Sequence, residues 1–403
     1  MSAARAHAAA VGQGGPPAAW RVLLAAAALH ACNDAFFYVL YPLLPFIAAE
    51  LGLSYTEVGL VNTAFAGSSG LLQLPAGLLG QRWGEYALLV WGNGWVAAGL
   101  GAMAAAASFP LLLAMAVLAG LGGNLQHPLA ASLVARAYAS GRRGLAIGTL
   151  NFAGDLGKLA APGLVTVVAP GFGWRATLVG LGLFGVLFSA VVGLARRWVR
   201  PPAALGGDAP STDGPADRPT LPRSFGLLNA VGMLDATTRT AALTFLPFVL
   251  ARRDLSVGEI GLVFGVMFAG GALGKLACGP LGDRFGGFAV VLATETTTAL
   301  ALCGLVWGPL GASFAIAAVL GFGLNGTSSV LYAAVATFVP RTSHGAGYGV
   351  YYTTTQCAAA VSALGYGLLA DRVGLDWTFA AMAALTFAVA PLATPIRRQL
   401  AIT

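Results

Sequence analysis

The sequence is poor in charge. Only 9% of its 403 residues are Asp, Glu, Lys or Arg, whereas 57% are hydrophobic. Because soluble domains carry about 25% charged residues, this composition excludes an ordinary soluble enzyme and predicts a protein that crosses a membrane many times. In a soluble protein the net charge of +7 would suggest a nucleic-acid partner. Here the positions of the arginines indicate membrane topology instead, and we expect no nucleic acid.

Cysteine, histidine and lysine are also scarce. The four cysteines all lie in apolar stretches without ligand spacing, which predicts neither a disulfide nor a metal site. The sequence has no Gly-x-x-x-x-Gly-Lys-Ser/Thr motif, which argues against a nucleotide-driven pump. The polar groups sit within apolar stretches, while the loops hold arginine and glycine, an arrangement that argues against a membrane-embedded enzyme. We therefore expect no catalytic residue, no metal and no cofactor.

Charge clusters and Gly/Pro breaks divide the chain into twelve apolar spans, and a spanning helix needs roughly 20 apolar residues. The fold class predicted is an all-α membrane protein in two pseudo-symmetric six-helix bundles. The Ala/Gly/Pro-rich residues 1–19 are expected to be a disordered tail, and the Pro/Asp/Arg-rich residues 197–222 a cytoplasmic linker. The bundles then occupy residues 20–196 and 223–398. The expected spans are 21–47, 57–79, 86–107, 111–136, 145–169, 174–195, 224–250, 257–281, 288–308, 310–338, 346–370 and 376–396.

Arginine positions favour one orientation. With both termini cytoplasmic, fifteen basic residues fall on the cytoplasmic side, and only Arg175, Arg252, Arg253 and Arg372 fall outside. The excess of Lys and Arg in cytoplasmic loops predicts cytoplasmic N- and C-termini. We expect a multi-pass protein of a bacterial-type cytoplasmic (inner) membrane.

The two halves repeat. A shift of 202 residues places Pro45 on Pro247 and Gly84 on Gly286. Parallel repeats that enclose a binding site between them near the bilayer midplane are a common transporter plan.

A loop motif carries a resemblance. Residues 77–84 read Gly-Leu-Leu-Gly-Gln-Arg-Trp-Gly, residues 279–286 read Gly-Pro-Leu-Gly-Asp-Arg-Phe-Gly, and a third echo occupies residues 367–374. This pattern is similar to the signature G-x-L-x-D-R-x-G of the major facilitator superfamily. The resemblance extends over the whole chain and implies a conformational latch, in which Gln81 replaces the usual Asp and weakens the first copy. The latch residues would be Gly77, Gln81, Arg82, Gly84, Gly279, Asp283, Arg284 and Gly286.

The first half resembles the fosmidomycin-resistance branch of drug exporters more closely. The matching segments include His30-x-x-Asn-Asp34, Leu53-Ser-Tyr-x-x-x-Gly59, His127-Pro128 and the residues 141–146, Gly-Arg-Arg-Gly-Leu-Ala. This resemblance implies proton-driven efflux of small, often anionic compounds. The Asp155/Lys158 pair departs from the branch pattern, so the substrate can differ.

Nearly all polar residues within the spans map to helices that, in the superfamily, line or flank the central cavity. The predicted proton-coupling residues are Asp34, His30, His127, Asp155 and Asp235. The predicted substrate-binding residues are Asn33, Tyr41, Asn124, Gln126, Lys158, Arg239, Lys275, Asn325 and Gln356.

Spacing separates the acids. Asp155 and Lys158 at i,i+3, and Asp235 and Arg239 at i,i+4, can each form an ion pair on one helix face. Asp34 has only His30 one helical turn away, with His127 as a candidate neighbour across the cavity, so we predict that it stays free of a permanent cation and carries the proton, because an unpaired buried carboxylate is readily protonated.

Structural alternatives accompany these assignments. The two pairs can simply hold helices in register, and His127-Pro128 can be a helix kink. The Lys275 side chain can extend toward water. Glu295, on a predicted outer helix, is interpreted as structural.

The predicted function is a proton-coupled exporter of small, mostly anionic compounds that works by alternating access. The alternative is a proton symporter that imports an organic anion such as a carboxylate. The expected partners are a small-molecule substrate, protons and the lipid bilayer, and a monomer is expected.

Overall fold

A computed structural model describes residues 17–71, 79–80, 82–123, 125–138, 140–199, 222–340 and 344–400. Within these ranges every regular element is a helix, which confirms the all-α prediction. Backbone groups in a bilayer core must be satisfied internally, and a helix does this within one segment.

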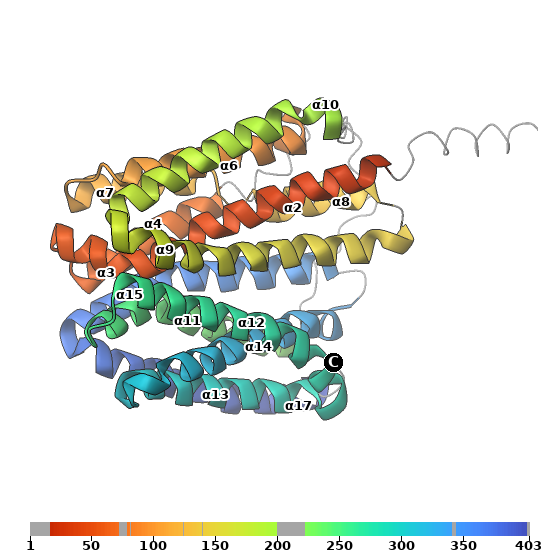
Figure 1. Cartoon of the computed structure of the whole chain (residues 1–403). Helices are drawn as coiled ribbons and strands as arrows, with labels where there is room; N and C mark the ends of the chain where they lie inside the picture. Colours follow the sequence, from red (N-terminus) through yellow and green to blue (C-terminus); the bar gives the residue numbers. More distant parts are fainter. Residues whose placement is uncertain are drawn as a thin grey trace, which may run out of the picture.

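The first half contains eight helices in the described ranges, and the longer ones lie roughly parallel to one another along the molecule (Figure 1). They are α2 (Pro17–Tyr38), α3 (Leu40–Leu51), α4 (Tyr55–Leu71), α6 (Glu85–Met103), α7 (Phe109–Gly120), α8 (Gln126–Ala137), α9 (Ser140–Leu194) and α10 (Arg196–Val199).

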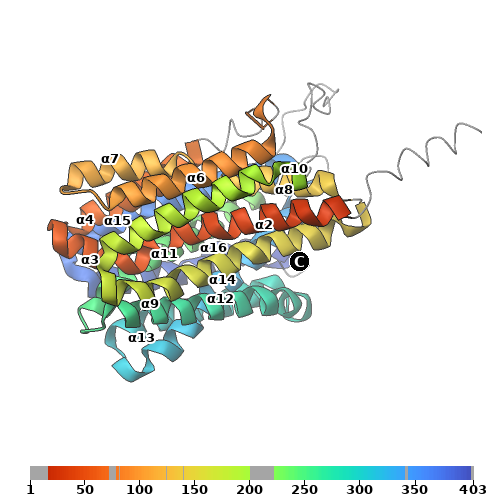
Figure 2. The same ribbon diagram turned by 45° about the horizontal axis from the view of Figure 1, so that its top comes forward.

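The second half repeats this layout. Its elements are α11 (Arg223–Ala251), α12 (Val257–Phe285), α13 (Gly287–Trp307), η1 (Leu310–Ala312), α14 (Ser313–Phe338), α15 (His344–Phe387), α16 (Val389–Ala393), η3 (Thr394–Ile396) and α17 (Arg397–Leu400). The two bundles lie side by side with their helices roughly parallel (Figure 2).

Two long helices each make two passes. In α9 the chain reverses at Gly173, with φ 74°, and in α15 it reverses at Gly374, with φ 83°. Positive φ is easily adopted only by glycine, so these two residues permit the sharp kinks. With α2 and α3 counted as one pass, and α7 and α8 as another, the described residues form the twelve predicted spans.

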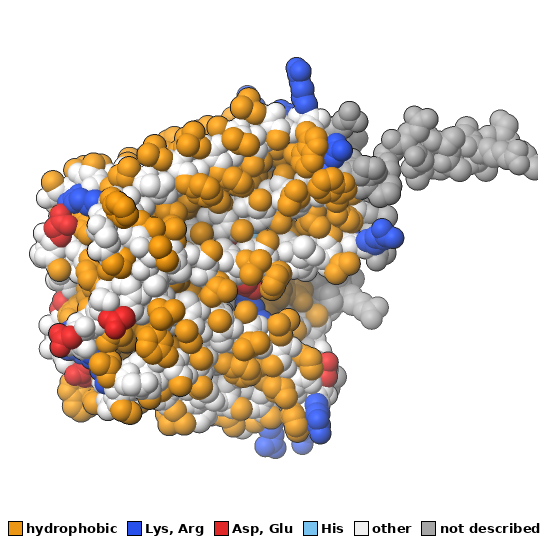
Figure 3. Space-filling model, in the orientation of Figure 1, with side chains coloured by type: hydrophobic (Ala, Val, Ile, Leu, Met, Phe, Trp, Pro, Cys, Tyr) orange, Lys and Arg blue, Asp and Glu red, His pale blue; other side chains and the backbone are white. Residues whose placement is uncertain are grey.

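Six described helical stretches are long and apolar enough to cross a membrane. Large apolar side chains such as Leu183, Leu187 and Leu194 are exposed, as expected for a surface in contact with lipid. Figure 3 shows hydrophobic side chains over most of the visible face. Its charged side chains gather at the two ends and at the boundary between the bundles.

Among the described residues, one buried cluster is shared by the two bundles, and it lies at one end. There, Leu44 and Val58 of the first half belong to one buried cluster with Phe245 and Phe264 of the second. We call this the closed end; it also holds the α3–α4 turn. Toward the opposite end, which we call the terminal end, each bundle has a core of its own: one includes Leu29 and Leu133, the other Leu228 and Leu331.

Close helix contacts seal the closed end. A Cβ on Gly59 of α4 would lie 2.2 Å from the carbonyl oxygen of Ala363 on α15. A Cβ on Gly261 of α12 would lie 2.6 Å from Thr166 Oγ1 on α9. Small residues let helices approach this closely in a membrane. The structure is therefore one state of a two-bundle molecule, with the bundles joined at one end.

The latch residues divide into two groups. The structure does not describe the latch residues Gly77 and Gln81. Also outside the described residues are Asn124, the tail residues 1–16 and the linker residues 200–221. Gly84 and Gly286, which the 202-residue repeat aligns, precede α6 and α13, and each has φ 83°. The two halves thus place a glycine with the same φ at equivalent positions.

The latch arginines Arg82 and Arg284 are exposed at the terminal end, as is Asp283, while Gly279 lies within α12. Asp283 forms no ion pair with any described residue. The role of the latch stays a prediction for another state of the molecule.

Candidate functional site

Four charged side chains form a continuous ion-pair chain across the boundary between the bundles. Lys158 Nζ on α9 lies 3.3 Å from Asp34 Oδ2 on α2 and 3.2 Å from Asp155 Oδ1. Asp155 Oδ1 in turn accepts a 2.6 Å hydrogen bond from Lys275 Nζ on α12. The ion-pair chain therefore links the first bundle to the second. Its two inner members, Lys158 and Asp155, each contact two groups of the opposite charge.

The prediction that Asp34 stays free of a permanent cation is wrong. Its side chain is only 6% exposed, and Lys158 supplies the missing charge. A carboxylate this deeply buried needs a cation or a proton. Sequence spacing pointed to Asp155 as the only partner of Lys158, because spacing within one helix cannot show that α2 packs against α9.

Two imidazoles adjoin the buried carboxylate. The ring centroids of His30 on α2 and His127 on α8 are 4.8 Å apart in an edge-on arrangement, and both rings interact electrostatically with Asp34. His30 Nδ1 is buried without a hydrogen-bond partner. A Cβ at Gly154 of α9 would lie 2.5 Å from His30 Nε2 and 2.8 Å from Asp34 Oδ2, so a glycine at this position lets α9 reach the cluster.

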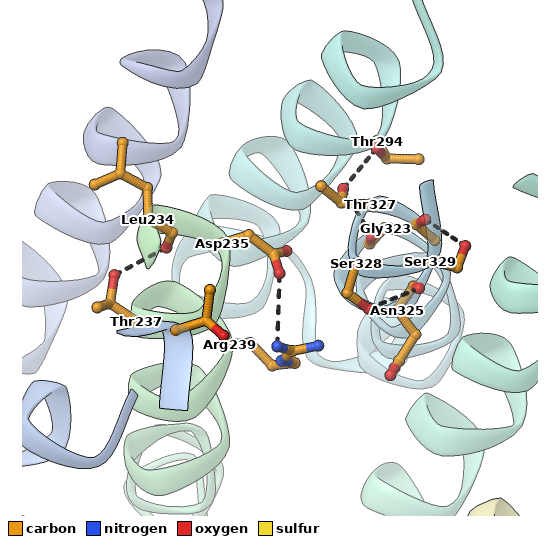
Figure 4. Close-up of polar contacts among 12 residues, drawn as sticks. Leu234, Asp235, Thr237, Arg239, Thr294, Gly323, Asn325, Thr327, Ser328 and Ser329 are labelled. Atoms are coloured by element: carbon orange, nitrogen blue, oxygen red, sulfur yellow. Dashed lines mark hydrogen bonds and ion pairs between the residues drawn. The ribbon is translucent and has the colours of Figure 1, made fainter. Parts of the chain in front are cut away.

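A second pair lies in the other bundle. Arg239 Nη2 is 3.6 Å from Asp235 Oδ2, both on α11, as the i,i+4 spacing predicted. Figure 4 shows Arg239 directed from α11 toward α14, where Asn325 lies. Asp235 is 4% exposed, so the pair is largely enclosed by protein.

Glu295 is closer to this pair than its place on an outer helix suggested. This residue, on α13, is 3% exposed and interacts electrostatically with both Asp235 and Arg239. The sign in the sequence that Glu295 could belong to a functional site was its place as a lone carboxylate in an apolar span.

A small hollow lies between the two charged groups. It is lined by residues of both bundles: Tyr38, Lys158, Arg239, Leu243, Met267, Phe268, Leu324 and Asn325. Lys158 Nζ is 5.5 Å from the centroid of the Tyr38 ring. The lining combines two cations, an amide and an aromatic ring on an apolar floor, residue types that favour a small anion, although in this state the space is about the size of one water molecule.

Three other predicted substrate-binding residues lie elsewhere. Gln126 is fully buried and donates a 2.9 Å hydrogen bond to the Leu89 carbonyl of α6, inside the first bundle. Asn33 is buried, and its Nδ2 has no partner among the described residues. Gln356 is exposed on α15.

Tyr41 lies closer to the hollow. It packs edge-on against Tyr38, with 5.6 Å between ring centroids, and interacts electrostatically with Arg239. Of the predicted substrate residues, Lys158, Arg239 and Asn325 line the hollow, whereas Tyr41 and Lys275 stand next to its residues. Among the described residues, no three His, Cys, Asp or Glu side chains are grouped to hold a metal ion.

The sequence and the fold both have known relatives. The chain matches the profile of the Major Facilitator Superfamily over residues 26–226 and 228–400. It is 24% identical over 354 residues to the fosmidomycin resistance protein of Escherichia coli (strain K12), covering 87% of this chain and 86% of that protein. It is 24% identical over 363 residues to the hexuronate transporter of Bacillus subtilis (strain 168), covering 82% and 83%.

The fold resembles a solved structure of a bacterial homologue of the human lysosomal transporter Spinster, in an inward-facing and unoccupied conformation. The TM-score is 0.80 at 17% identity, over 96% of this chain and 98% of that one. At this identity the likeness concerns the fold alone.

Proposed function

The chain belongs to the major facilitator superfamily, and on that premise we propose that it is a proton-coupled secondary transporter of small organic anions. The observation that carries this proposal is the placement of Lys158, Arg239 and Lys275. These three cations come from α9, α11 and α12, meet at the boundary between the bundles, and stand around or beside the hollow. Charged side chains at membrane depth are costly and rare, so three cations gathered in one place mark a candidate site for binding or coupling.

The residue types favour an anionic cargo. Arg239 offers a planar fork of donors that suits a carboxylate or phosphonate, and the two lysines offer compact point charges. Each of the three cations forms an ion pair with an aspartate of the protein: Asp34, Asp155 or Asp235. The site is thus charge-balanced before cargo arrives, and the acids are candidates for the proton.

Alternating access is supported by the asymmetry of the two ends. One buried cluster joins the bundles at the closed end, while each bundle has a separate core toward the terminal end. If the terminal end faces the cytoplasm, as the arginines predict, this state releases or collects cargo on the inside. We propose a monomer with cytoplasmic termini in a bacterial-type inner membrane.

Two coupling directions follow from the same site. Export by proton antiport is favoured by the likeness to the fosmidomycin resistance protein. Uptake by proton symport is favoured by the likeness to the hexuronate transporter, and by the ion-pair chain discussed below.

The proposal is tested by a thermal-shift screen of purified protein against carboxylates, sulfonates and phosphonates, glucuronate and fosmidomycin included. We expect at least one anion to raise the unfolding temperature of the unmutated protein but not of Arg239→Ala. Arg398→Ala, at an exposed position of α17, is the matched control and should respond like the unmutated protein.

The compound found is then tested in proteoliposomes under an imposed inward proton gradient. Accumulation indicates symport and expulsion indicates antiport. A flux that ignores the gradient, or stabilisation by neutral compounds only, would contradict the proposal.

A further inference from the structure

Asp155 occupies a position between two ammonium groups of different bundles. Its Oδ1 lies 3.2 Å from Lys158 Nζ and 2.6 Å from Lys275 Nζ. Short contacts with two cations are also what the anionic group of a substrate would require there. The carboxylate of Asp155 therefore fills the place that a substrate carboxylate would take.

The place is accessible. The side chains of Asp155, Lys158 and Lys275 are 20%, 23% and 34% exposed, whereas Asp34 is 6% exposed. Lys158 also lines the hollow. Lys158 is therefore the member of the ion-pair chain that an anion approaching through the hollow would contact.

Charge balance then limits what can bind. Asp34, Lys158, Asp155 and Lys275 contribute two negative and two positive charges, so a bound monoanion adds one uncompensated negative charge. A carboxylate that has lost its cations in a partly buried site is strongly disfavoured in its charged form. A proton on the displaced carboxylate restores the balance.

Among the described residues, Asp155 forms ion pairs with Lys158 and Lys275 and with no other side chain. Lys158 faces it from α9 and Lys275 from α12, while α2 contributes His30 and Asp34. From α8, His127 interacts electrostatically with Asp34, His30 and both lysines, and Arg239 of α11 acts on Lys275. A substrate anion would bind the same two ammonium groups that hold Asp155.

We propose that the anionic group of the substrate replaces the Asp155 carboxylate between Lys158 and Lys275, and that the displaced Asp155 takes up one proton. A monoanion and one proton then bind together. This inference rests on the proposed anion transport and specifies its coupling: a monoanion moves with one proton, so an inward proton gradient drives uptake. Because Lys275 belongs to the second bundle, the substrate also takes over the link between the bundles.

The inference is tested by the protons that accompany binding. Purified protein in weakly buffered detergent solution is mixed with the monoanion selected by the thermal-shift screen, and a pH indicator reports proton uptake. We expect about one proton taken up per anion bound by the unmutated protein. Asp155→Asn should bind the anion with no proton uptake. Asp254→Asn is the control: Asp254 lies at the closed end, with φ 62°, a conformation that Asn tolerates.

The outcomes are distinct. No net uptake, or release of protons, on binding to the unmutated protein overturns the inference and leaves anion transport standing. Undiminished proton uptake by Asp155→Asn also overturns it. If no anion of the screen binds at all, the proposed function itself fails. Should Asp155→Asn not yield folded protein, the proton stoichiometry of the unmutated protein decides alone.

Discussion

Asp371 at the closed end of α15 caps the first turn of α4 in the opposite bundle, through Thr56 and its neighbour. Its two carboxylate oxygens accept hydrogen bonds from the backbone N–H groups of Tyr55, at 2.9 Å, and Thr56, at 2.8 Å. The Thr56 hydroxyl donates a further bond. The first N–H groups of a helix have no partner within the helix and attract negative charge, so this contact joins the bundles in the present state.

Replacing Asp371 by Ala should weaken closure at this end. Hydrogen bonds to a charged acceptor contribute about 1.5–3 kcal/mol, and because this one is exposed we expect roughly 1 kcal/mol, a shift of about fivefold toward the opposite state. Pulsed electron paramagnetic resonance between spin labels at the α3–α4 turn and the α15 kink, in a cysteine-free background, measures it. An unchanged distance distribution would show that the cap does not contribute to closure.

Gly59 on α4 offers a sterically sharper test of the same closure. A Val side chain there would collide with the Ala363 carbonyl of α15, since even a Cβ would lie 2.2 Å from that oxygen. Overpacking of this kind costs typically 1–3 kcal/mol, so we expect Gly59→Val to separate the closed end. Gly67→Val, on the same helix with no atom within 4 Å of its added Cβ, should leave the label distances unchanged.

Gly154 should be essential to the buried cluster. Its replacement by Ala places a methyl group against His30 Nε2 and Asp34 Oδ2, which forces α2 and α9 apart and lowers the free energy of unfolding by about 1–3 kcal/mol. Transport and the thermal unfolding midpoint should both fall. Gly163→Ala, also on α9 but with open space around its Cβ, is the matched control, and an equal loss in both variants would refute the role of this contact.

The sequence predicted the features that depend on one helix at a time. The twelve spans follow from hydropathy, and the Asp155–Lys158 and Asp235–Arg239 pairs follow from helical spacing. The sequence repeat aligns Gly84 with Gly286, and in the structure the two glycines have the same φ.

Features that depend on helix packing were not predicted. The Asp34–Lys158 and Asp155–Lys275 contacts depend on which faces of α2, α9 and α12 meet, and hydropathy does not encode this rotation. For the same reason Gln126, placed in the cavity by its span number, points into the first bundle. The sequence shows the motif echo at residues 367–374. That its Asp371 caps a helix of the other bundle can be seen only when the closed end is folded.

Arg239 should determine affinity for the anion through the geometry of its fork. Arg239→Gln removes a charged donor from the hollow and should weaken binding by about 1.5–3 kcal/mol, or tenfold to more than a hundredfold. Arg239→Lys keeps the charge but loses the two-pronged contact, so part of the loss should remain. Titration calorimetry with the anion found in the screen measures both; a full rescue by Lys would show that charge alone matters.

The last prediction sets Asp155 against Asp34 as the proton-carrying acid. If one proton binds with each anion, the affinity of the unmutated protein rises by up to about tenfold for each unit by which pH falls in the coupled range. Asp155→Asn should bind anions with no such pH dependence, because its amide cannot take the proton. Asp34→Asn should weaken the pH dependence without abolishing it: the loss of one negative charge eases the charge balance, but Asp155 is still displaced from both ammonium groups and still takes up a proton. If Asp34→Asn alone abolished the pH dependence, the proton would belong to the buried acid beside His30 and His127, and the bridging carboxylate would serve only to hold the two bundles together.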